Sequence, residues 1–236
     1  MTERLVIDNQ NQLKEFRETV FPQHPAGIRL MGKIISWIFH PVFIPVYVVW
    51  FLVYVHPYLF AGFTEWNKSI VMIQAFVMFT FFPVITVLLL RALKFINTIY
   101  LHTQKDRIIP FVACGVWYFW IWYVWRNMGQ LKDAIIIPTA AVQFALAIFL
   151  ASSIGLLVNI YMKVSLHAIS MGVMITFIML LAFSQETSFG LYISVAFLVA
   201  GLVCTARFIV SDHTQKEVYA GLLLGIVSQL IANLVG

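Results

Sequence analysis

Three short polar clusters interrupt an otherwise apolar chain, and the one nearest the C-terminus carries the most specific chemistry. Arg207 is followed after five residues by His213, and Glu217 comes four positions after that histidine. A spacing of four places His213 and Glu217 on one face of a helix. A carboxylate bonded to one imidazole nitrogen raises the basicity of the other, as in a nucleophile or base with its orienting group. The alternative is an ordinary polar loop with a helix-stabilising pair.

A second cluster brings an amine, a hydroxyl and an imidazole within five residues, in Lys163, Ser165 and His167. The cluster stands where an apolar segment begins, and the free N–H groups and dipole of a helix start favour an anion. It is therefore a candidate phosphate site. The alternative is a lysine that extends to the membrane surface beside a histidine bonded inside a helix bundle.

The remaining cluster supplies two cations, Lys105 and Arg107, just before another apolar segment. Pro110 follows, and proline suits the first turn of a helix. The cations could hold phosphate near the membrane surface. The alternative is a juxtamembrane basic loop.

Transmembrane helices are the elements that position these clusters. Of the 236 residues, 61% are hydrophobic and only 11% are charged, and the mean hydropathy is +0.91. A soluble domain is typically about 25% charged, and each membrane span needs about 20 apolar residues. We predict an all-α polytopic transmembrane helix bundle of six to seven spans. The apolar segments lie at about 31–55, 68–93, 108–127, 134–161, 164–184, 189–210 and 216–235.

Prolines predict interruptions in the first two segments. His40, Pro41 and Pro45 predict a kink or a re-entrant stretch in the first, and Pro83 predicts a kink in the second. His40 lies near the face that carries the clusters, where it could border the same pocket or cap a kinked helix. It is not included among the candidate site residues.

The chain divides into residues 1–27, a polar extension expected to be cytoplasmic or interfacial, and residues 28–236, the transmembrane domain. The polar clusters occupy about 100–225. In the last segment, Gly221 and Gly225 predict close helix packing. The extension contains a weak helical stripe that could lie on the membrane surface. This stripe comprises Leu5, Leu13, Phe16, Val20 and Phe21.

The distribution of positive charge predicts the orientation in a cell (inner) membrane. Loops that alternate between the two sides put the N-terminus and all three clusters at one face. That face holds 12 of the 15 lysines and arginines: Arg4, Lys14, Arg17, Arg29, Lys33, Arg91, Lys94, Lys105, Arg107, Lys163, Arg207 and Lys216. Without the four cations of the clusters the tally is still 8 to 3. The positive-inside rule therefore places this face in the cytoplasm.

Composition also argues against several functions. The net charge is +5, but no Lys/Arg-rich run exists, so nucleic-acid binding is not expected. Cys114 and Cys204 both fall within apolar segments, which argues against a disulfide framework or a metal site. We expect no metal and no cofactor. The oligomeric state is left open.

The meeting of three clusters at one face predicts a phosphate pocket with two histidines, one to attack and one to protonate a leaving group. Their order and spacing resemble those of the phosphatidic acid phosphatase type 2 superfamily, which includes membrane lipid phosphatases and vanadium haloperoxidases. The third motif of that family is Ser-Arg, five residues, His, three residues, Asp. It is similar here to Ala206-Arg207, five residues, His213, three residues, Glu217. The second, Pro-Ser-Gly-His, is similar to residues 164–167, Val-Ser-Leu-His.

The resemblance implies a role for each histidine. His213 would attack phosphorus and form a phosphohistidine, Glu217 would orient it, and His167 would protonate the leaving oxygen. The candidate phosphate-binding residues are Lys105, Arg107, Lys163, Ser165 and Arg207. The mechanism needs no metal, because cations stabilise the transferring group. The implied substrate is a phosphomonoester or diphosphate of a lipid, such as a polyprenyl diphosphate or phosphatidic acid.

This chain departs from the family pattern. The first family motif is Lys, six residues, Arg-Pro, whereas Lys105 and Arg107 are only two apart and Pro110 comes later. Ala206 replaces a serine and removes a possible phosphate contact, and Leu166 replaces a glycine and adds bulk.

Two other functions use the same residues. A non-catalytic lipid-phosphate binding protein or transporter would need the cations but not the nucleophile. A haem-binding subunit would use His167 and His213 as iron ligands and would show a Soret band.

Overall fold

The computed structural model describes residues 4–7, 13–16, 24–96, 104–130, 135–184, 189–210 and 213–236; the side chains of 4–7, 13–16 and 105 lie outside this description. Most of the described residues are helical. The elements are β1 (Arg4–Ile7), β2 (Leu13–Phe16), α1 (Ala26–Ile38), α2 (Ile44–Trp50), η1 (Phe51–Val55), α3 (Glu65–Phe76), η2 (Val77–Phe81), α4 (Phe82–Ala92), α5 (Gln104–Asn127), η3 (Met128–Gln130), α6 (Thr139–Tyr161), α7 (Leu166–Phe183), α8 (Gly190–Val210) and α9 (Gln215–Val235).

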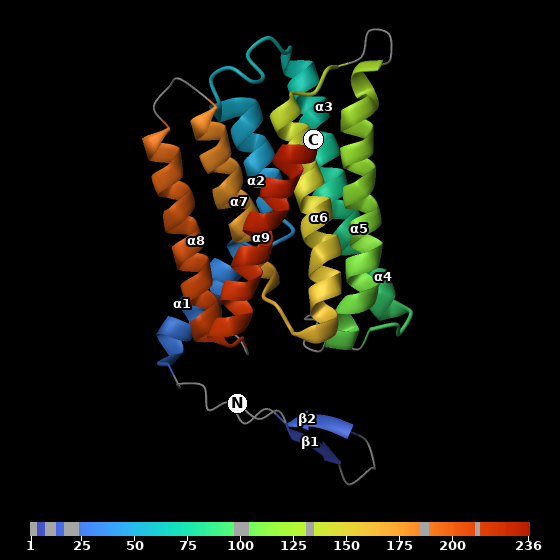
Figure 1. The fold of residues 1–236 in the computed structure, drawn as a ribbon, viewed down its shortest axis with the longest axis vertical. Coiled ribbons are helices and arrows are strands. Elements are labelled where there is room, and N and C mark those ends of the chain that lie inside the picture. The colour runs from blue at the N-terminus through green and yellow to red at the C-terminus, as the bar shows by residue number, and fades with distance from the viewer. Residues whose placement is uncertain are drawn as a thin grey trace.

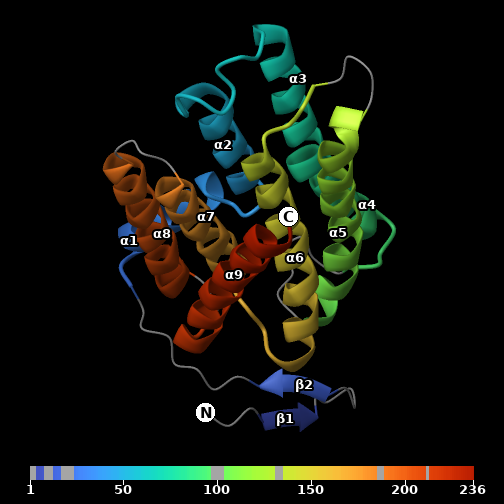
Figure 2. The ribbon, with the colours of Figure 1, turned by 45° about the horizontal axis from the view of Figure 1, so that its top comes forward.

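Within the described ranges, six helical segments are long and apolar enough to cross a membrane. They are Glu65–Ala92, Asp106–Gln130, Thr139–Tyr161, Leu166–Phe183, Gly190–Val210 and Gln215–Val235. They form one bundle, in which α6 lies between α5 and α9 (Figures 1 and 2). The predicted all-α transmembrane bundle of six to seven spans is confirmed.

The first apolar segment breaks, as its prolines predicted. It divides into α1 and a shorter apolar helix, Ile44–Val55. Pro41 and its neighbours form turns between them. The side chains of Thr80 and Tyr47 donate to the carbonyl oxygens of Val42 (2.8 Å) and Ile38 (3.0 Å). Backbone groups freed inside a bilayer need such partners, and these two bonds stabilise the break.

Pro83 distorts the second segment without ending it. Proline has no N–H, and its ring collides with the carbonyl group four residues earlier. The turn before it, η2, is a π-helix that joins α3 to α4. Such a turn relieves the collision while the helix continues.

Small residues let α7 and α9 pack closely, as Gly221 and Gly225 predicted. A Cβ atom at Gly225 would collide with the carbonyl oxygen of Ile169, and one at Gly172 with that of Leu222. A Cβ at Gly221 would lie 2.8 Å from the carbonyl oxygen of Ser165. The close contact therefore extends to the residue that begins α7.

The predicted helical stripe in the N-terminal extension is wrong at Leu5, Leu13 and Phe16, and Val20 and Phe21 lie outside the described residues. Arg4–Ile7 and Leu13–Phe16 are antiparallel strands, with Leu5 paired to Glu15 and Ile7 to Leu13 (Figure 1). β-Branched residues in the first strand and an Asp/Asn/Gln-rich stretch before the second favour a hairpin over a helix.

The prediction that Pro110 stands in the first turn of its helix is also wrong. α5 begins at Gln104, so Arg107 lies in the first turn and Pro110 is inside the helix. A proline there removes the hydrogen bond to the carbonyl of Asp106. The carboxylate of Asp106 in the first turn favours this earlier start through the helix dipole.

Candidate functional site

His213 and Glu217 form a buried hydrogen-bonded pair at the start of α9. Nδ1 of His213 lies 2.7 Å from Oε2 of Glu217, and each residue is 6% exposed. With Nδ1 donating to the carboxylate, the lone pair of His213 is on Nε2. His213 lines a cavity within the described bundle. Its arrangement suits a nucleophile or a base.

A capping box fixes the pair. The N–H of Glu217 donates to the hydroxyl of Thr214 (3.4 Å), and the N–H of Thr214 donates to Oε2 of Glu217 (3.3 Å). The carboxylate thus receives one bond from the helix cap and one from His213. Reciprocal bonds of this kind define where a helix begins, so the histidine stands at a fixed position.

Ser165 joins its own cluster, residues 163–167, to the cluster that contains His213 and Glu217. Its N–H donates to the carbonyl oxygen of Glu217 (3.1 Å), and its hydroxyl caps α7 by accepting from the N–H of Ala168 (3.4 Å). Ser165 is fully buried and is not among the residues that line the cavity. The structure places this serine where it positions the loop, not at the cavity wall.

Three cations come from three different elements to the same cavity. Arg107 (α5), Lys163 (before α7) and Arg207 (last turn of α8) all line it, and the first two are 5% and 7% exposed. Nη1 of Arg107 donates to the carbonyl oxygen of Val164 (2.6 Å), which ties α5 to the Lys163 loop. The name cationic wall is used below for these three side chains with His167 and His213.

Burial and nearby charge keep His213 neutral. Burial lowers the pKa of His213 to about 4, and the hydrogen bond to Glu217 acts in the opposite direction. The cations Lys163, Arg107 and Arg207 lower the pKa further. An unprotonated Nε2 is therefore available across the physiological pH range.

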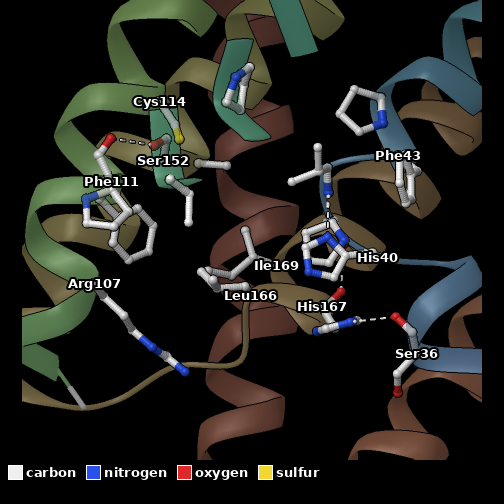
Figure 3. A pocket seen from close by; sticks show the side chains of 18 of the residues that line it. Ser36, His40, Phe43, Arg107, Phe111, Cys114, Ser152, Leu166, His167 and Ile169 are labelled. Atoms are coloured by element: carbon white, nitrogen blue, oxygen red, sulfur yellow. Dashed lines mark hydrogen bonds between the residues drawn. The ribbon is translucent and has the colours of Figure 1, made fainter. Parts of the chain in front are cut away.

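His167 lies in the first turn of α7 and also faces the cavity. Its Nε2 is 3.0 Å from the carbonyl oxygen of Ser36 in α1, so Nε2 donates and Nδ1 is the second polar atom of the ring. Its ring centroid lies 5.3 Å from that of His40, with the rings nearly perpendicular. Figure 3 shows the two histidines together at one side of the cavity and Arg107 at the other.

Much of the remaining lining is apolar, and the cavity is large. Its volume is about 1120 Å³. The name apolar wall is used for Val84, Val87, Leu88, Phe111, Ile148 and Val173, from α4, α5, α6 and α7. Trp37 and Leu88 line the cavity yet are 73% and 48% exposed on the isolated chain. The cavity therefore reaches the side of the bundle, where lipid would lie.

The structure brings most of the predicted site residues together. Arg107, Lys163, His167, Arg207 and His213 line one cavity, and Glu217 holds His213. Ser165 stands apart from the wall, and the side chain of Lys105 lies outside the described part of the chain.

His40 is the main residue that sequence reasoning left out. It lines the cavity beside His167, in the turns between α1 and α2. The available signal was a histidine next to the proline that breaks an apolar segment, at the face of the clusters. Lys33 and Ser36 of α1 also line the cavity and had no such signal.

Within the described ranges, no group of three or more His, Cys, Asp or Glu side chains is placed to hold a metal ion. Comparison of the chain with protein-family models, with curated proteins and with solved structures gave no match. The functional argument therefore rests on the residues themselves.

Proposed function

We propose that the protein is a membrane lipid phosphatase that hydrolyses a lipid phosphomonoester or diphosphate through a phosphohistidine. The observation that carries the proposal is a His213 ring held by the carboxylate of Glu217 at a cavity with a cationic wall and an apolar wall. The spacing of Arg207, His213 and Glu217, similar to the third motif of the phosphatidic acid phosphatase type 2 superfamily, supports it.

The cationic wall accounts for phosphate binding. Arg107, Lys163 and Arg207 would surround the phosphoryl oxygens and stabilise the charge that they carry during transfer. Since the side chains are held at a buried site, their electrostatic effect exceeds that of cations in water.

His213 would carry the covalent step. Its Nε2 attacks phosphorus, a P–N bond forms, and the P–O bond to the lipid breaks. The proton on Nδ1 stays in the hydrogen bond to Glu217, whose charge stabilises the imidazolium as it develops. His167 protonates the leaving oxygen. Water then attacks phosphorus, the P–N bond breaks with its electron pair returning to Nε2 of His213, and His167 takes the proton from water.

The apolar wall accounts for the choice of a lipid. A soluble phosphate ester would leave Val84, Leu88 and Phe111 in contact with water, whereas an acyl or prenyl chain covers them. The membrane spans and the exposed Trp37 at the cavity edge favour a substrate that arrives through the bilayer. The excess of lysine and arginine at the face of the clusters supports a head group at the cytoplasmic face.

The experiment is phosphate release by detergent-purified protein with EDTA present. The panel includes polyprenyl diphosphate, phosphatidic acid and phosphatidylglycerol phosphate. We expect release by the wild type and by His24→Ala, a histidine outside the cavity, and none by His213→Ala. An acid-labile, base-stable phosphoenzyme should form in the wild type and in His24→Ala, but not in His213→Ala.

A different result would support the binding or transport function. In that case no lipid phosphate would be cleaved, and binding would depend on Arg207 but not on His213. Intramembrane ionisable residues serve transport paths as well as catalysis, so this outcome is physically reasonable.

A further inference from the structure

His40 occupies a position in the cavity that the three polar clusters do not explain. It lies in the turns between α1 and α2, where the N–H of Phe43 donates to its carbonyl oxygen (2.8 Å). Its side chain lines the cavity and is exposed there.

The tautomer of His40 follows from its backbone contact. Nδ1 accepts a hydrogen bond from the N–H of Val42 (3.4 Å). A nitrogen that accepts from an N–H carries no proton, so the ring is neutral and its hydrogen is on Nε2. Protonation at Nδ1 would break this contact and set two N–H groups against each other.

His167 has the opposite environment. Its Nε2 faces a carbonyl oxygen, that of Ser36, at 3.0 Å. A carbonyl oxygen accepts a hydrogen bond from the N–H of either the neutral or the cationic ring, so this bond is kept whether or not Nδ1 of His167 carries a proton. A proton on Nδ1 is therefore free to be given to substrate. The two neighbouring rings are therefore suited to different tasks: His167 to give up a proton, and His40 to donate a hydrogen bond that it keeps.

His40 lies between His167, a member of the cationic wall, and the apolar ring of Phe43, and all three line the cavity. On one side of His40 is His167, at 5.3 Å between centroids, and on the other is Phe43, at 6.2 Å (Figure 3). In a lipid phosphate, one oxygen joins the phosphorus to the apolar chain. If phosphate lies at the cationic wall and the chain at the apolar wall, this oxygen must lie at their boundary.

We propose that His40 is a further catalytic residue, which donates a hydrogen bond from Nε2–H of its neutral ring to the leaving oxygen of the lipid. The inference rests on the phosphatase function proposed above. When the P–O bond breaks, its electron pair goes to the leaving oxygen, and the proton from Nδ1 of His167 completes the alcohol. His40 stabilises the developing charge and keeps its own proton. In the second step water attacks phosphorus, the P–N electron pair returns to His213, and the proton from water restores His167.

The test compares two substrates that differ in how much help the leaving oxygen needs. One is an alkyl phosphate monoester. The other is a 4-nitrophenyl phosphate monoester that carries an alkyl chain of the same length on its ring. We expect His40→Leu to lower kcat on the alkyl phosphate by about 10²-fold, the typical loss of one preorganised donor. On the nitrophenyl phosphate, kcat should stay within about threefold, because a good leaving group develops little charge that needs stabilising. His40→Gln, which keeps a side-chain N–H but cannot be protonated, should retain most of the alkyl activity.

Three results with the variants would overturn the inference. Equal losses on both substrates would mean a structural role, and no loss on either would mean no role. A His40→Gln variant as slow as His40→Leu on the alkyl phosphate would mean that His40 acts by giving up a proton or by its shape. Thermal unfolding of both variants, with His24→Leu as the control, identifies any loss of folded protein. A wild type that releases phosphate from neither substrate would refute the phosphatase function itself, and the role of His40 with it.

Discussion

Replacing Glu217 by glutamine tests the centre of the proposed mechanism with a minimal change in shape. The carboxylate of Glu217 holds Nδ1 of His213 at 2.7 Å, and both residues are buried. The variant removes the charge that stabilises the imidazolium formed when His213 attacks phosphorus. A hydrogen bond to a charged group contributes about 1.5–3 kcal/mol, and each 1.4 kcal/mol or so is a factor of ten in rate. We therefore expect kcat to fall roughly 10- to 150-fold.

The pH dependence of this variant gives a second, independent measure. The bond to Glu217 opposes the lowering of the His213 pKa that burial and the cations cause. Its loss should lower that pKa below its value of about 4, so the acid limb of kcat/KM moves to lower pH. The titration of the substrate is common to both proteins and cancels in the comparison.

Glu65→Gln is the matched control for this experiment. Glu65 also forms an ion pair, with Lys68 at 2.8 Å, but its side chain is 78% exposed and the pair lies away from the cavity. An exposed pair of this kind contributes little, so kcat should not change. The reasoning would be refuted by an unchanged kcat in Glu217→Gln, or by an acid limb that moves to higher pH.

Three further predictions concern the cavity, the stability of the folded protein and the packing of α7 against α9. Cys114→Trp, which would fill part of the cavity, should lower kcat/KM more for a long-chain than for a short-chain lipid phosphate, whereas Cys204→Trp, at a residue that is not among the lining residues, should leave this preference unchanged; equal effects of both variants would contradict a chain bound in the cavity. Because the pKa of His213 is lowered to about 4 from 6.5, the unfolded state binds the proton more tightly, so the melting temperature should fall as pH drops from 6.5 to 4, and less steeply in His213→Ala. Gly225→Ala should destabilise the bundle by about 1–3 kcal/mol through overpacking, whereas Gly201→Ala, where an added Cβ has no neighbour within 4 Å, should not; equal melting temperatures would contradict the close α7–α9 contact.

The spans and the pairing of His213 with Glu217 could be predicted from the sequence because both depend on local spacing. A run of apolar residues as long as a bilayer is thick gives a helix whatever its neighbours are. The four-residue interval between His213 and Glu217 gives a contact within one helical turn. The helix start at Thr214 was also readable, because Thr-x-x-Glu is the pattern of a capping box.

What could not be predicted depends on packing between distant segments. The contact of His167 with Ser36 joins residues 131 positions apart, and only the fold brings α1 to α7. The same fold brings His40 to the cavity beside His167. The role of Ser165 was hidden for a similar reason, since its N–H partner is the carbonyl of Glu217 in another helix.

The two hydrogen bonds of the Glu217 carboxylate explain why this chain can carry glutamate where the similar family motif has aspartate. The carboxylate has two donors to satisfy: Nδ1 of His213, and the N–H of the N-cap residue Thr214. At the third position of a helix, reaching back to the N-cap is the part that glutamate or glutamine plays in a capping box. An aspartate, shorter by one methylene, would lose one of these bonds or move the histidine toward the helix. The same residue receives the N–H of Ser165 at its carbonyl oxygen, and Gly221, one turn later, leaves room for that approach. The first turn of α9 therefore holds the cluster at residues 163–167 in a fixed position relative to His213. The longer side chain at position 217 contributes to this arrangement.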